Sequence, residues 1–588
     1  MRILLLTHSF NSLTQRLFAE LAADGHDLSV EFDIADSVAD EAVALFRPDV
    51  IVAPFLKRPV PESIWSRHLV LIVHPGIVGD RGPSALDWAI AGGEREWGVT
   101  VLQAEADMDA GPVWASADFP LRAAAKASVY RNEVTRAALA AVREALGHIP
   151  AWRAGRWQPR PLATIGDARG RLRPLMRQTE RAIDWSRDDT ATVLAKIHAA
   201  DGFPGVADRL FGHACHLFDA HPAPAEAGAA PGEVLARRDG AVLRAIVDGA
   251  VWIGHVRRAD AAHAFKLPAT VAFAAEAAAL PERPAPLMRG AADHGELRYR
   301  ESEDGTVGFL AFEFYNGAMS TAQCERLAAA IRFAAGRPTR VLVLEGGRDF
   351  WSNGIHLNTI EAADSATNSP ADESWANINA MNDVCLALLT LTDRVTVAAL
   401  RGNAGAGGCF LALAADEVWA RDGIVLNPHY KNMGNLYGSE YWSYLLPRRV
   451  GADAARAIMQ DRLPLLARRA LDEGLVDACF GADCGAFETE VERRAARLAA
   501  DPALSGRIAA KARRRAEDEA LKPLAAYRAE ELACMRRNFY GFDPSYHVAR
   551  YHFVTKSPQS WTPRHLARHR DLGWRVPAAA GAPSAVEA

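Results

Sequence analysis

His74 is the first residue whose type and setting suggest chemistry. It directly follows the apolar run 69–73, and Pro75-Gly76 and then Asp80-Arg81-Gly82 come after it. A histidine beside a carboxylate can act as a general base, because the carboxylate holds one tautomer of the ring. Open α/β sheets place their sites beyond the strand ends, so this position is compatible with a catalytic base, although a histidine at a strand end is by itself more often structural.

Two glycine-containing turns in the second half predict a site for an oxyanion. The first is the segment 351–357, and the second is the glycine-rich segment 401–409. Each follows an apolar run typical of a strand, at 340–345 and 395–400. Such turns expose backbone N–H groups that can stabilise a developing negative charge. Because glycine occurs in loops everywhere, neither turn alone identifies a site.

The segment 427–442 is dense in polar and aromatic side chains. It contains three candidates for proton transfer: His429, Tyr430 and Glu440. A Glu side chain in an apolar pocket has its pKa raised by desolvation, which suits acid–base catalysis. The alternative is packing in a core or an interface, which we prefer for three further aromatic residues: Tyr437, Tyr441 and Trp442.

Three stretches of the chain must position these residues. Residues 1–150 alternate short apolar runs with helical spacing, which predicts a parallel sheet with crossover helices. Residues 183–270 hold short runs bounded by Gly or Pro, which predicts a small, mostly β module. The alternating pattern resumes from 297, and 452–515 is largely helical in pattern. The expected strands are 3–7, 49–54, 69–73, 97–102, 241–247, 250–255, 306–313, 340–345 and 395–400, and the expected helices are 14–24, 190–200, 320–335 and 375–392.

The composition excludes several classes of protein. The chain has 588 residues, of which 49% are hydrophobic and 24% charged, as in globular proteins. Its net charge of −5 argues against a nucleic-acid partner. No apolar run is long enough for a membrane span, and the run at 1–7 predicts a strand, not a signal peptide. Seven scattered cysteines indicate reduced thiols in the cytoplasm, with no metal site.

The first half resembles the formyltetrahydrofolate-dependent formyltransferases in the order of its motifs. These motifs are His74-Pro75, the loop 80–84 and the turn 107–111, and the resemblance continues to about residue 270. It implies that His74 is the general base and Asp109 its partner. It also implies that 10-formyltetrahydrofolate binds near two segments: Phe55, Leu56 and Lys57, and Arg81 and Gly82.

One residue departs from that family. Ile72 stands where the family has an Asn that donates to the oxyanion. The loss of one such donor can lower the rate about 10²–10³-fold. A thiol acceptor, which is a better nucleophile at neutral pH than an alcohol, would need less of this help.

The two glycine-containing turns, in their strand–turn–helix order, resemble the crotonase (enoyl-CoA hydratase/isomerase) superfamily. The resemblance implies that the backbone N–H groups of Ile355 and Gly407 polarise the thioester carbonyl of an acyl-CoA. It implies CoA contacts from three neighbouring residues: Ser352, Gly354 and Gly408. The Glu positions of the hydratases are occupied by Phe410 and the segment 428–429. Thioester chemistry other than water addition is therefore expected.

The fusion of these halves, together with the segment 427–442, resembles the HypX (HoxX) family of nickel–iron hydrogenase maturation proteins over nearly the whole chain. The resemblance implies formyl transfer from 10-formyltetrahydrofolate to coenzyme A, and then decarbonylation of formyl-CoA to CO and CoA. The partners implied are these small molecules and other hydrogenase maturation proteins, without a metal cofactor.

The expected architecture is α/β and multidomain. It has a Rossmann-like formyltransferase fold over 1–160, a mostly β, OB-like module over 175–275, a crotonase-like α/β spiral over 295–545, and a C-terminal extension over 546–588 with a disordered end. Two alternatives stay open. One is a formyltransferase fused to an acyl-CoA hydrolase or isomerase that makes no CO, and the other is a non-catalytic scaffold that binds folate and CoA.

Overall fold

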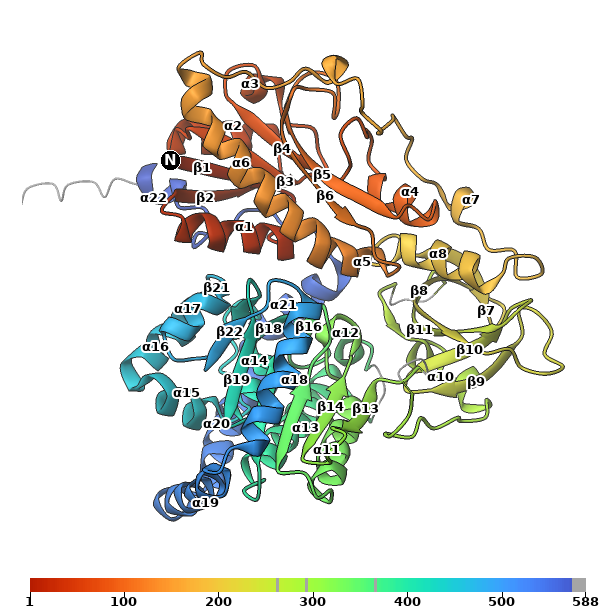
Figure 1. Cartoon of the computed structure of the whole chain (residues 1–588), viewed down its shortest axis with the longest axis vertical. Helices are drawn as coiled ribbons and strands as arrows, with labels where there is room; N and C mark the ends of the chain where they lie inside the picture. Colours follow the sequence, from red (N-terminus) through yellow and green to blue (C-terminus); the bar gives the residue numbers. More distant parts are fainter. Residues whose placement is uncertain (261–263, 291–293, 364–366, 574–588) are drawn as a thin grey trace, which may run out of the picture.

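The computed structural model describes residues 1–260, 264–290, 294–363 and 367–573. Three parts follow one another along the chain and pack side by side (Figure 1). They are an N-terminal α/β part, a small β module and a larger C-terminal α/β part, in agreement with the expected fold class. The expected disordered end at 577–588 lies outside the described residues.

A six-stranded sheet forms the N-terminal part. Its order is β2-β1-β3-β4-β5-β6, with β1 to β4 parallel and β5 and β6 antiparallel. Its strands are β1 (Arg2–Thr7), β2 (Asp27–Phe32), β3 (Val50–Phe55), β4 (Val70–His74), β5 (Glu96–Gln103) and β6 (Val113–Pro120). Its helices are α1 (Ser12–Ala23), α2 (Asp36–Phe46), α3 (Glu62–Trp65), α4 (Ala85–Ala91), α5 (Lys126–Val129), η1 (Tyr130–Val134), α6 (Thr135–Arg153), η2 (Leu162–Thr164) and α7 (Gln178–Arg181).

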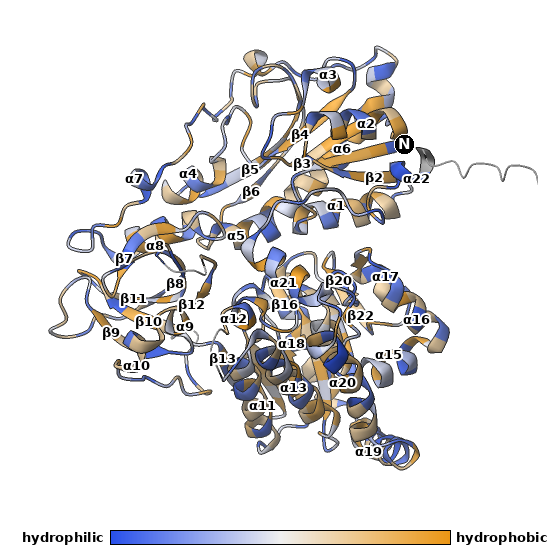
Figure 2. Ribbon diagram, turned by 180° about the vertical axis from the view of Figure 1, so that it is seen from behind, coloured by the Kyte–Doolittle hydropathy of each residue, from blue (hydrophilic) through white to orange (hydrophobic). Residues whose placement is uncertain are grey.

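Local sequence explains these elements. The four expected strands of this part match β1, β3, β4 and β5 to within about two residues. Helix α1 begins where the Asn11 side chain accepts the N–H of Thr14 at 3.0 Å. Apolar side chains of α1 and α6 cover one face of the sheet, and those of α2 and α3 cover the other (Figure 2). The strands are therefore buried on both faces.

The middle module is an antiparallel sheet with helix α8 packed on it. The strand order is β7-β8-β11-β10-β9, and β12 pairs with β11. The elements are α8 (Thr190–Ala200), β7 (Val206–Leu210), β8 (His213–Ala223), β9 (Val234–Arg238), β10 (Ala241–Ala245), β11 (Ala250–Arg258), β12 (Leu267–Pro268), α9 (Ala269–Ala272) and α10 (Ala274–Ala278). The expected helix 190–200 is confirmed as α8.

The C-terminal part contains two sheets, ordered β13-β14-β15-β17-β19-β22 and β16-β18-β20-β21. The strands are β13 (Leu297–Glu301), β14 (Val307–Phe312), β15 (Val341–Glu345), β16 (Phe350–Ser352), β17 (Val395–Leu400), β18 (Asn403–Gly405), β19 (Glu417–Arg421), β20 (Val425–Asn427), β21 (Leu465–Leu466) and β22 (Ala478–Phe480). The first helices are η3 (Tyr315–Gly317), α11 (Thr321–Ala335), α12 (Leu357–Glu361), α13 (Pro370–Leu389), α14 (Gly407–Leu413) and α15 (Trp442–Val450).

Helices dominate the rest of the chain. They are α16 (Ala452–Gln460), α17 (Ala467–Asp472), α18 (Cys484–Ala500), α19 (Leu504–Leu521), α20 (Leu524–Tyr540), α21 (Ser545–Thr555) and α22 (His569–Gly573). The expectation of helix over 452–515 is therefore correct, except that β21 and β22 interrupt it. Among the described residues, no helix is both long and apolar enough to cross a bilayer.

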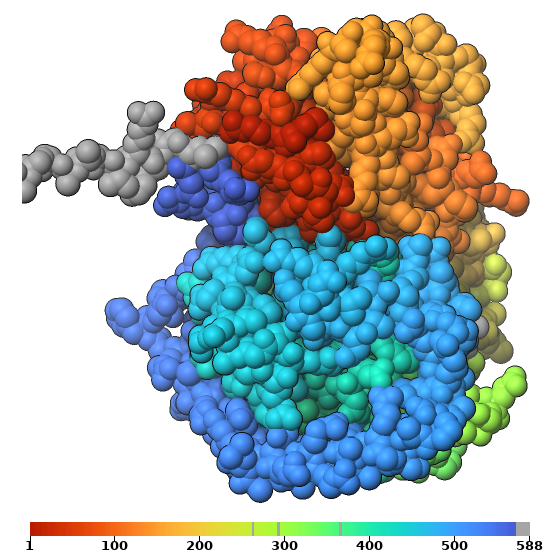
Figure 3. All heavy atoms as spheres, turned by 60° about the vertical axis from the view of Figure 1, so that its left-hand side comes forward, coloured from red at the N-terminus to blue at the C-terminus, as the bar shows by residue number. Residues whose placement is uncertain are grey.

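The final segment returns to the N-terminal part. The N–H of Val30 in β2 donates to the Leu566 carbonyl at 3.0 Å, and the His569 ring bonds Ser29 Oγ at 2.7 Å. In Figure 3 this segment (blue) lies against the first strands (red), above the main body of the C-terminal part. The first and last parts of the chain are therefore joined by the segment 562–570 as well as by their direct interface.

Candidate functional site

His74 ends β4 and lies between two carboxylates. Its Nε2 is 3.0 Å from Asp80 Oδ1, and its Nδ1 is 3.6 Å from Asp109 Oδ2. The Asp80 side chain is fully buried, whereas that of Asp109 is 12% exposed. Asp80 therefore holds the inner side of the ring, and Asp109 marks the side that faces outward.

Glycine is required where the backbone passes the histidine. A Cβ on Gly76 would overlap His74 Nε2 and would lie 2.8 Å from Asp80 Oδ1. Gly82 has a φ of +113°, and its N–H donates to Asp109 Oδ2 at 3.1 Å. Arg81 pairs through its backbone with the segment 171–173, which lies between η2 and α7. This segment thus forms a wall of the site.

The residues expected near the folate lie at the end of β3. Phe55 accepts the His8 N–H at 2.6 Å, and the Lys57 N–H donates to Asp33 Oδ2 at 3.1 Å. Leu56 and Ile72 both pack against one apolar cluster under the sheet. Ile72 therefore takes a packing position where the family has its oxyanion donor.

The two glycine-containing turns of the C-terminal part touch each other. A Cβ on Gly354, whose φ is +79°, would lie 3.3 Å from the Gly407 nitrogen. The Gly354 N–H is held by Ser352 Oγ at 3.1 Å, and Trp351 Nε1 donates to the Gly408 carbonyl at 2.9 Å. Within the described part of the chain, neither Ile355 nor Gly407 has an acceptor for its backbone N–H. Two adjacent donors are thus available to an oxyanion.

Glu440 faces these turns. A Cβ on Gly407 would overlap Glu440 Oε1, so the carboxyl group lies directly against the second turn. Its other oxygen, Oε2, accepts the Tyr430 hydroxyl at 2.6 Å and the Ser439 N–H at 3.1 Å. The Tyr430 ring stacks on Phe410 at a centroid distance of 5.6 Å. An acid–base pair and two N–H donors therefore converge on one place.

Burial controls the proton affinity of this pair. Glu440 is 1% exposed, and desolvation raises its pKa to about 7 although the Tyr430 hydrogen bond opposes the change. Desolvation and the nearby Glu440 charge also raise the pKa of Tyr430 well above its ordinary value. Glu440 can therefore both take and give a proton near neutral pH.

His429 is not part of this arrangement. Both of its ring nitrogens are buried without a hydrogen-bond partner, and burial lowers its pKa to about 4. The charged and titratable groups that act on it are Asp461, Arg462 and His565. Tyr430, its neighbour in sequence, contacts Glu440 instead. Of the three candidates for proton transfer, the structure brings two together and leaves the third apart.

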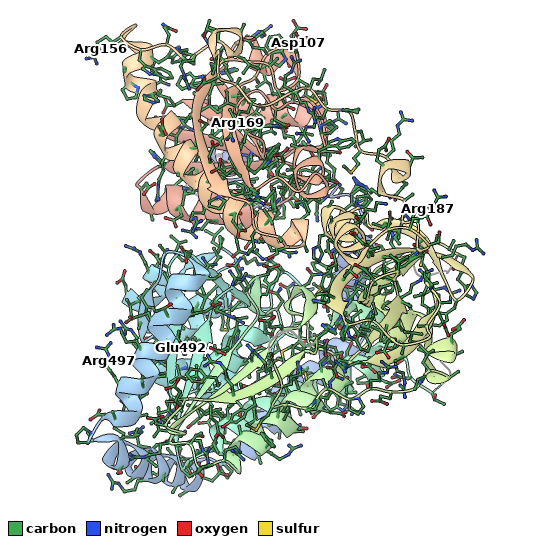
Figure 4. All side chains as sticks on the ribbon, turned by 45° about the vertical axis from the view of Figure 1, so that its right-hand side comes forward. Asp107, Arg156, Arg169, Arg187, Glu492 and Arg497 are labelled. Carbon is green, nitrogen blue, oxygen red and sulfur yellow. The ribbon has the colours of Figure 1, made fainter. Side chains whose placement is uncertain are left out.

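The two halves meet between these sites. Arg131 of η1 donates to Asp349 Oδ2 at 3.1 Å and to Asn316 Oδ1 at 3.0 Å, and Ser128 Oγ donates to Asp349 Oδ1 at 2.7 Å. Asp349 immediately precedes β16, the strand that leads to Gly354. Side chains fill this junction, whereas the labelled Arg187 and Arg497 project from the outer surface (Figure 4).

Two residues that hold the site, Asp80 and Asn382, could not be assigned that role from sequence. Asp80 lies within the quoted motif, but sequence alone could not show that it is closer to His74 than Asp109 is. Asn382 of α13 accepts the Glu440 N–H at 2.7 Å from 58 residues away, and no pattern in the sequence relates the two. No group of His, Cys, Asp or Glu in the described residues is suited to a metal ion.

Comparison with known families agrees with this architecture. The formyl transferase model matches residues 27–146, the formyl transferase C-terminal domain matches 175–264, and the enoyl-CoA hydratase/isomerase model matches 315–562. The chain is 29% identical to methionyl-tRNA formyltransferase of Variovorax paradoxus, over 38% of the chain and 68% of that protein.

Two proteins match over nearly the full length. Hydrogenase maturation factor HoxX of Bradyrhizobium diazoefficiens is 57% identical over 97% of both chains. The crystal structure of HypX from Aquifex aeolicus in complex with tetrahydrofolic acid superposes with a TM-score of 0.92, at 46% identity, over 98% of this chain and 100% of that one. This chain belongs to the HypX/HoxX family of hydrogenase maturation factors.

Proposed function

We propose that this chain makes carbon monoxide for the nickel–iron hydrogenase active site from the formyl group of 10-formyltetrahydrofolate. The formyl group passes first to coenzyme A, and formyl-CoA is then split to CO and CoA. The observation that carries the proposal is the Glu440–Tyr430 pair beside two free N–H donors, with Phe410 in place of a hydratase carboxylate. One acid–base group suits a proton moved within a thioester better than water addition, which uses a pair of carboxylates.

In the first step His74 takes the proton of the CoA thiol. The thiolate attacks the formyl carbon, the bond from that carbon to the folate nitrogen breaks, and the nitrogen receives the proton. With its Nε2 turned to Asp80, the ring presents Nδ1 toward the outer side. A thiolate needs less activation than an alkoxide, which fits the absence of a donor at Ile72.

We propose that the CoA phosphates bind where three cations converge. Arg131 comes from the N-terminal part, Lys266 from the middle module and Lys556 from the C-terminal end of α21. The charges of Arg131 and Lys556 both act on Lys266. Burial lowers the pKa of Lys266 to about 8 and also lowers that of Lys556. Among the described residues neither lysine forms a direct ion pair with a carboxylate, although the Asp201 and Asp219 charges act on Lys266 from a distance. A bound phosphate would supply that direct partner.

This placement explains how one CoA could serve both sites. Lys266 Nζ donates to Tyr315 Oη at 2.9 Å, and Arg131 bonds Asn316 of the same short helix. The anion site therefore lies at the junction between the formyl-transfer site and the thioester site. We propose that the CoA arm moves between them, so that formyl-CoA is protected from hydrolysis in water.

In the second step the N–H groups of Ile355 and Gly407 hold the formyl oxygen. The Glu440 carboxylate takes the formyl proton, the carbon–sulfur bond breaks and CO leaves. Glu440 then returns the proton to the CoA thiolate, so CoA is regenerated and no water or metal is consumed. Tyr430 steadies the carboxylate through its 2.6 Å hydrogen bond.

The test separates the two sites. Purified protein is given 10-formyltetrahydrofolate labelled at the formyl carbon, with and without CoA, and CO is trapped on reduced haemoglobin. We expect labelled CO from the wild type and none from His74→Ala or Glu440→Ala. Supplied formyl-CoA should restore CO in His74→Ala only. Formate without CO would favour a hydrolase, and binding without turnover would favour a scaffold; either outcome would overturn the proposal.

A further inference from the structure

Glu531 is a buried carboxylate for which the steps above have no role. It lies on α20 with 0% exposure. Its Oε2 accepts the Tyr441 N–H at 3.0 Å and the Ser439 hydroxyl at 3.3 Å. Its Oε1 accepts the Ser443 N–H at 2.8 Å and the Ser443 hydroxyl at 2.6 Å. All four bonds go to the residues that flank Glu440.

The backbone that these bonds hold is unfavourable by itself. Glu440 and Tyr441 both have a φ of +59°, so two consecutive residues with a Cβ lie in the left-handed region. Such a conformation persists only where its surroundings enforce it. Asn382 Oδ1 accepts the Glu440 N–H, and Glu531 accepts the N–H groups of Tyr441 and Ser443.

The charge of Glu531 also acts on Glu440. The pKa of both carboxyl groups is raised to about 7, chiefly by burial, and for Glu440 the Glu531 charge contributes to that rise. Each oxygen of Glu531 receives a backbone N–H, whereas Glu440 Oε1 receives no donor among the described residues. Hydrogen bonds to the charged form favour it, so Glu531 ionises first and Glu440 keeps its proton to higher pH.

The other groups near the pair do not compensate its charge. Tyr430 and the thiols of Cys324 and Cys385 are neutral, because burial raises the pKa of each. Arg528 of α20 acts on the Tyr441 hydroxyl, which is part of the turn, and donates to Asp383 Oδ1 at 2.6 Å. Glu531 is therefore the one charged group within the described residues that both contacts this turn and acts on Glu440.

We propose that Glu531 is a positioning residue for the second step, which holds the turn 439–443 so that Glu440 faces Gly407 and strengthens Glu440 as a base. The inference rests on the proposed function of Glu440. It assigns to α20 a task in catalysis that Glu531 performs through the turn 439–443.

The test measures CO release from supplied formyl-CoA against pH, in wild type, Glu531→Gln and the control Glu530→Gln. Glu530 is the adjacent residue, it is exposed, and it pairs with Lys522. For Glu531→Gln we expect a plateau rate lower by about tenfold or more, and a midpoint of the pH profile lower by about one pH unit. Glu530→Gln should match the wild type in both quantities.

A milder variant keeps the inference testable if Glu531→Gln does not fold. Ser443→Ala removes one hydroxyl donor to Glu531 and leaves the backbone bonds in place, so it should lower the plateau rate by a smaller factor. A folded Glu531→Gln, or failing that a folded Ser443→Ala, with the wild-type plateau and midpoint would overturn the inference. A wild type that makes no CO from formyl-CoA would instead overturn the proposed function.

Discussion

The two sites hold their reactive side chains by different means. His74 lies between two carboxylates, and a charged partner fixes its ring. Glu440 lies among a tyrosine hydroxyl, backbone N–H groups and apolar rings, with its one nearby charge of the same sign. The first site holds its histidine between carboxylates, whereas in the second site burial raises the pKa of the carboxyl group. The comparison shows that one chain can hold two candidate bases in environments of opposite kind.

Both sites nevertheless depend on a glycine beside the reactive group. A Cβ would overlap His74 at Gly76 and Glu440 at Gly407. These contacts leave no space for a methyl group, so the two glycines offer a way to disable each site separately without removing its reactive side chain.

The largest effect should come from Gly407→Ala. The new methyl group displaces Glu440, and we expect CO release from formyl-CoA to fall about 10³-fold, as for loss of the base itself. Formyl transfer to CoA should be unchanged. Gly506→Ala in α19, where a Cβ meets nothing within 4 Å, is the control. Equal loss at both sites would mean that the halves are not separable.

Asp80→Asn tests the electrostatic part of the comparison. An amide cannot hold the same tautomer of His74, so formyl transfer should fall about 10²-fold or more. Asp109→Asn, at the longer distance of 3.6 Å, should cost less. The readout is formyl-CoA formed in a Glu440→Ala background, where CO release is blocked. A larger loss in Asp109→Asn would reverse our assignment of the inner and outer carboxylates.

The pH dependence should separate the two steps. Burial raises the pKa of Glu440 to about 7, and the ionised form starts the second step. CO release from formyl-CoA should therefore fall about tenfold for each pH unit below 7. Formyl transfer does not use Glu440, so it should lack this dependence. Identical profiles for both steps would show that one shared event limits them.

The smallest effect concerns stability. Glu31 accepts hydrogen bonds from His569 at 2.9 Å, from Arg570 at 2.9 Å and from Thr562. Burial opposes ionisation, but these bonds and the Arg570 charge lower its pKa. Because the folded pKa is lowered, this contribution is present above the unfolded pKa and is lost as pH falls through the folded value.

Arg570→Ala should therefore lower the free energy of unfolding of the N-terminal part by about 1–2 kcal/mol at pH 7. The difference from the wild type, measured by thermal or denaturant unfolding, should shrink as the pH falls below 4. Arg564→Ala, which removes an exposed partner of Asp571, is the control. A difference that is independent of pH would exclude Glu31 as its source.

Most of the fold could be predicted, because short apolar runs and helix spacing are local. The turns of Gly354 and Gly407 and the end of β4 were predicted for the same reason. The supports of each site were not. Asn382 is 58 residues and Glu531 about 90 residues from the Glu440 turn along the chain. Only folding brings their side chains into contact with that turn. The sequence could not separate His429 from Tyr430, because adjacent residues can face different groups: Asp461, Arg462 and His565 act on His429, whereas Tyr430 bonds Glu440.

The return of residues 562–570 to β2 has a consequence for synthesis on the ribosome. Glu31 and its partner His569 are separated by 538 positions in the chain. At translation rates of about 5–20 residues per second, the buried carboxylate waits roughly 30–110 s for its partners. The N-terminal part therefore remains incomplete until α22 emerges, and a chain cut short before Thr562 leaves an unpaired charge beneath its first sheet.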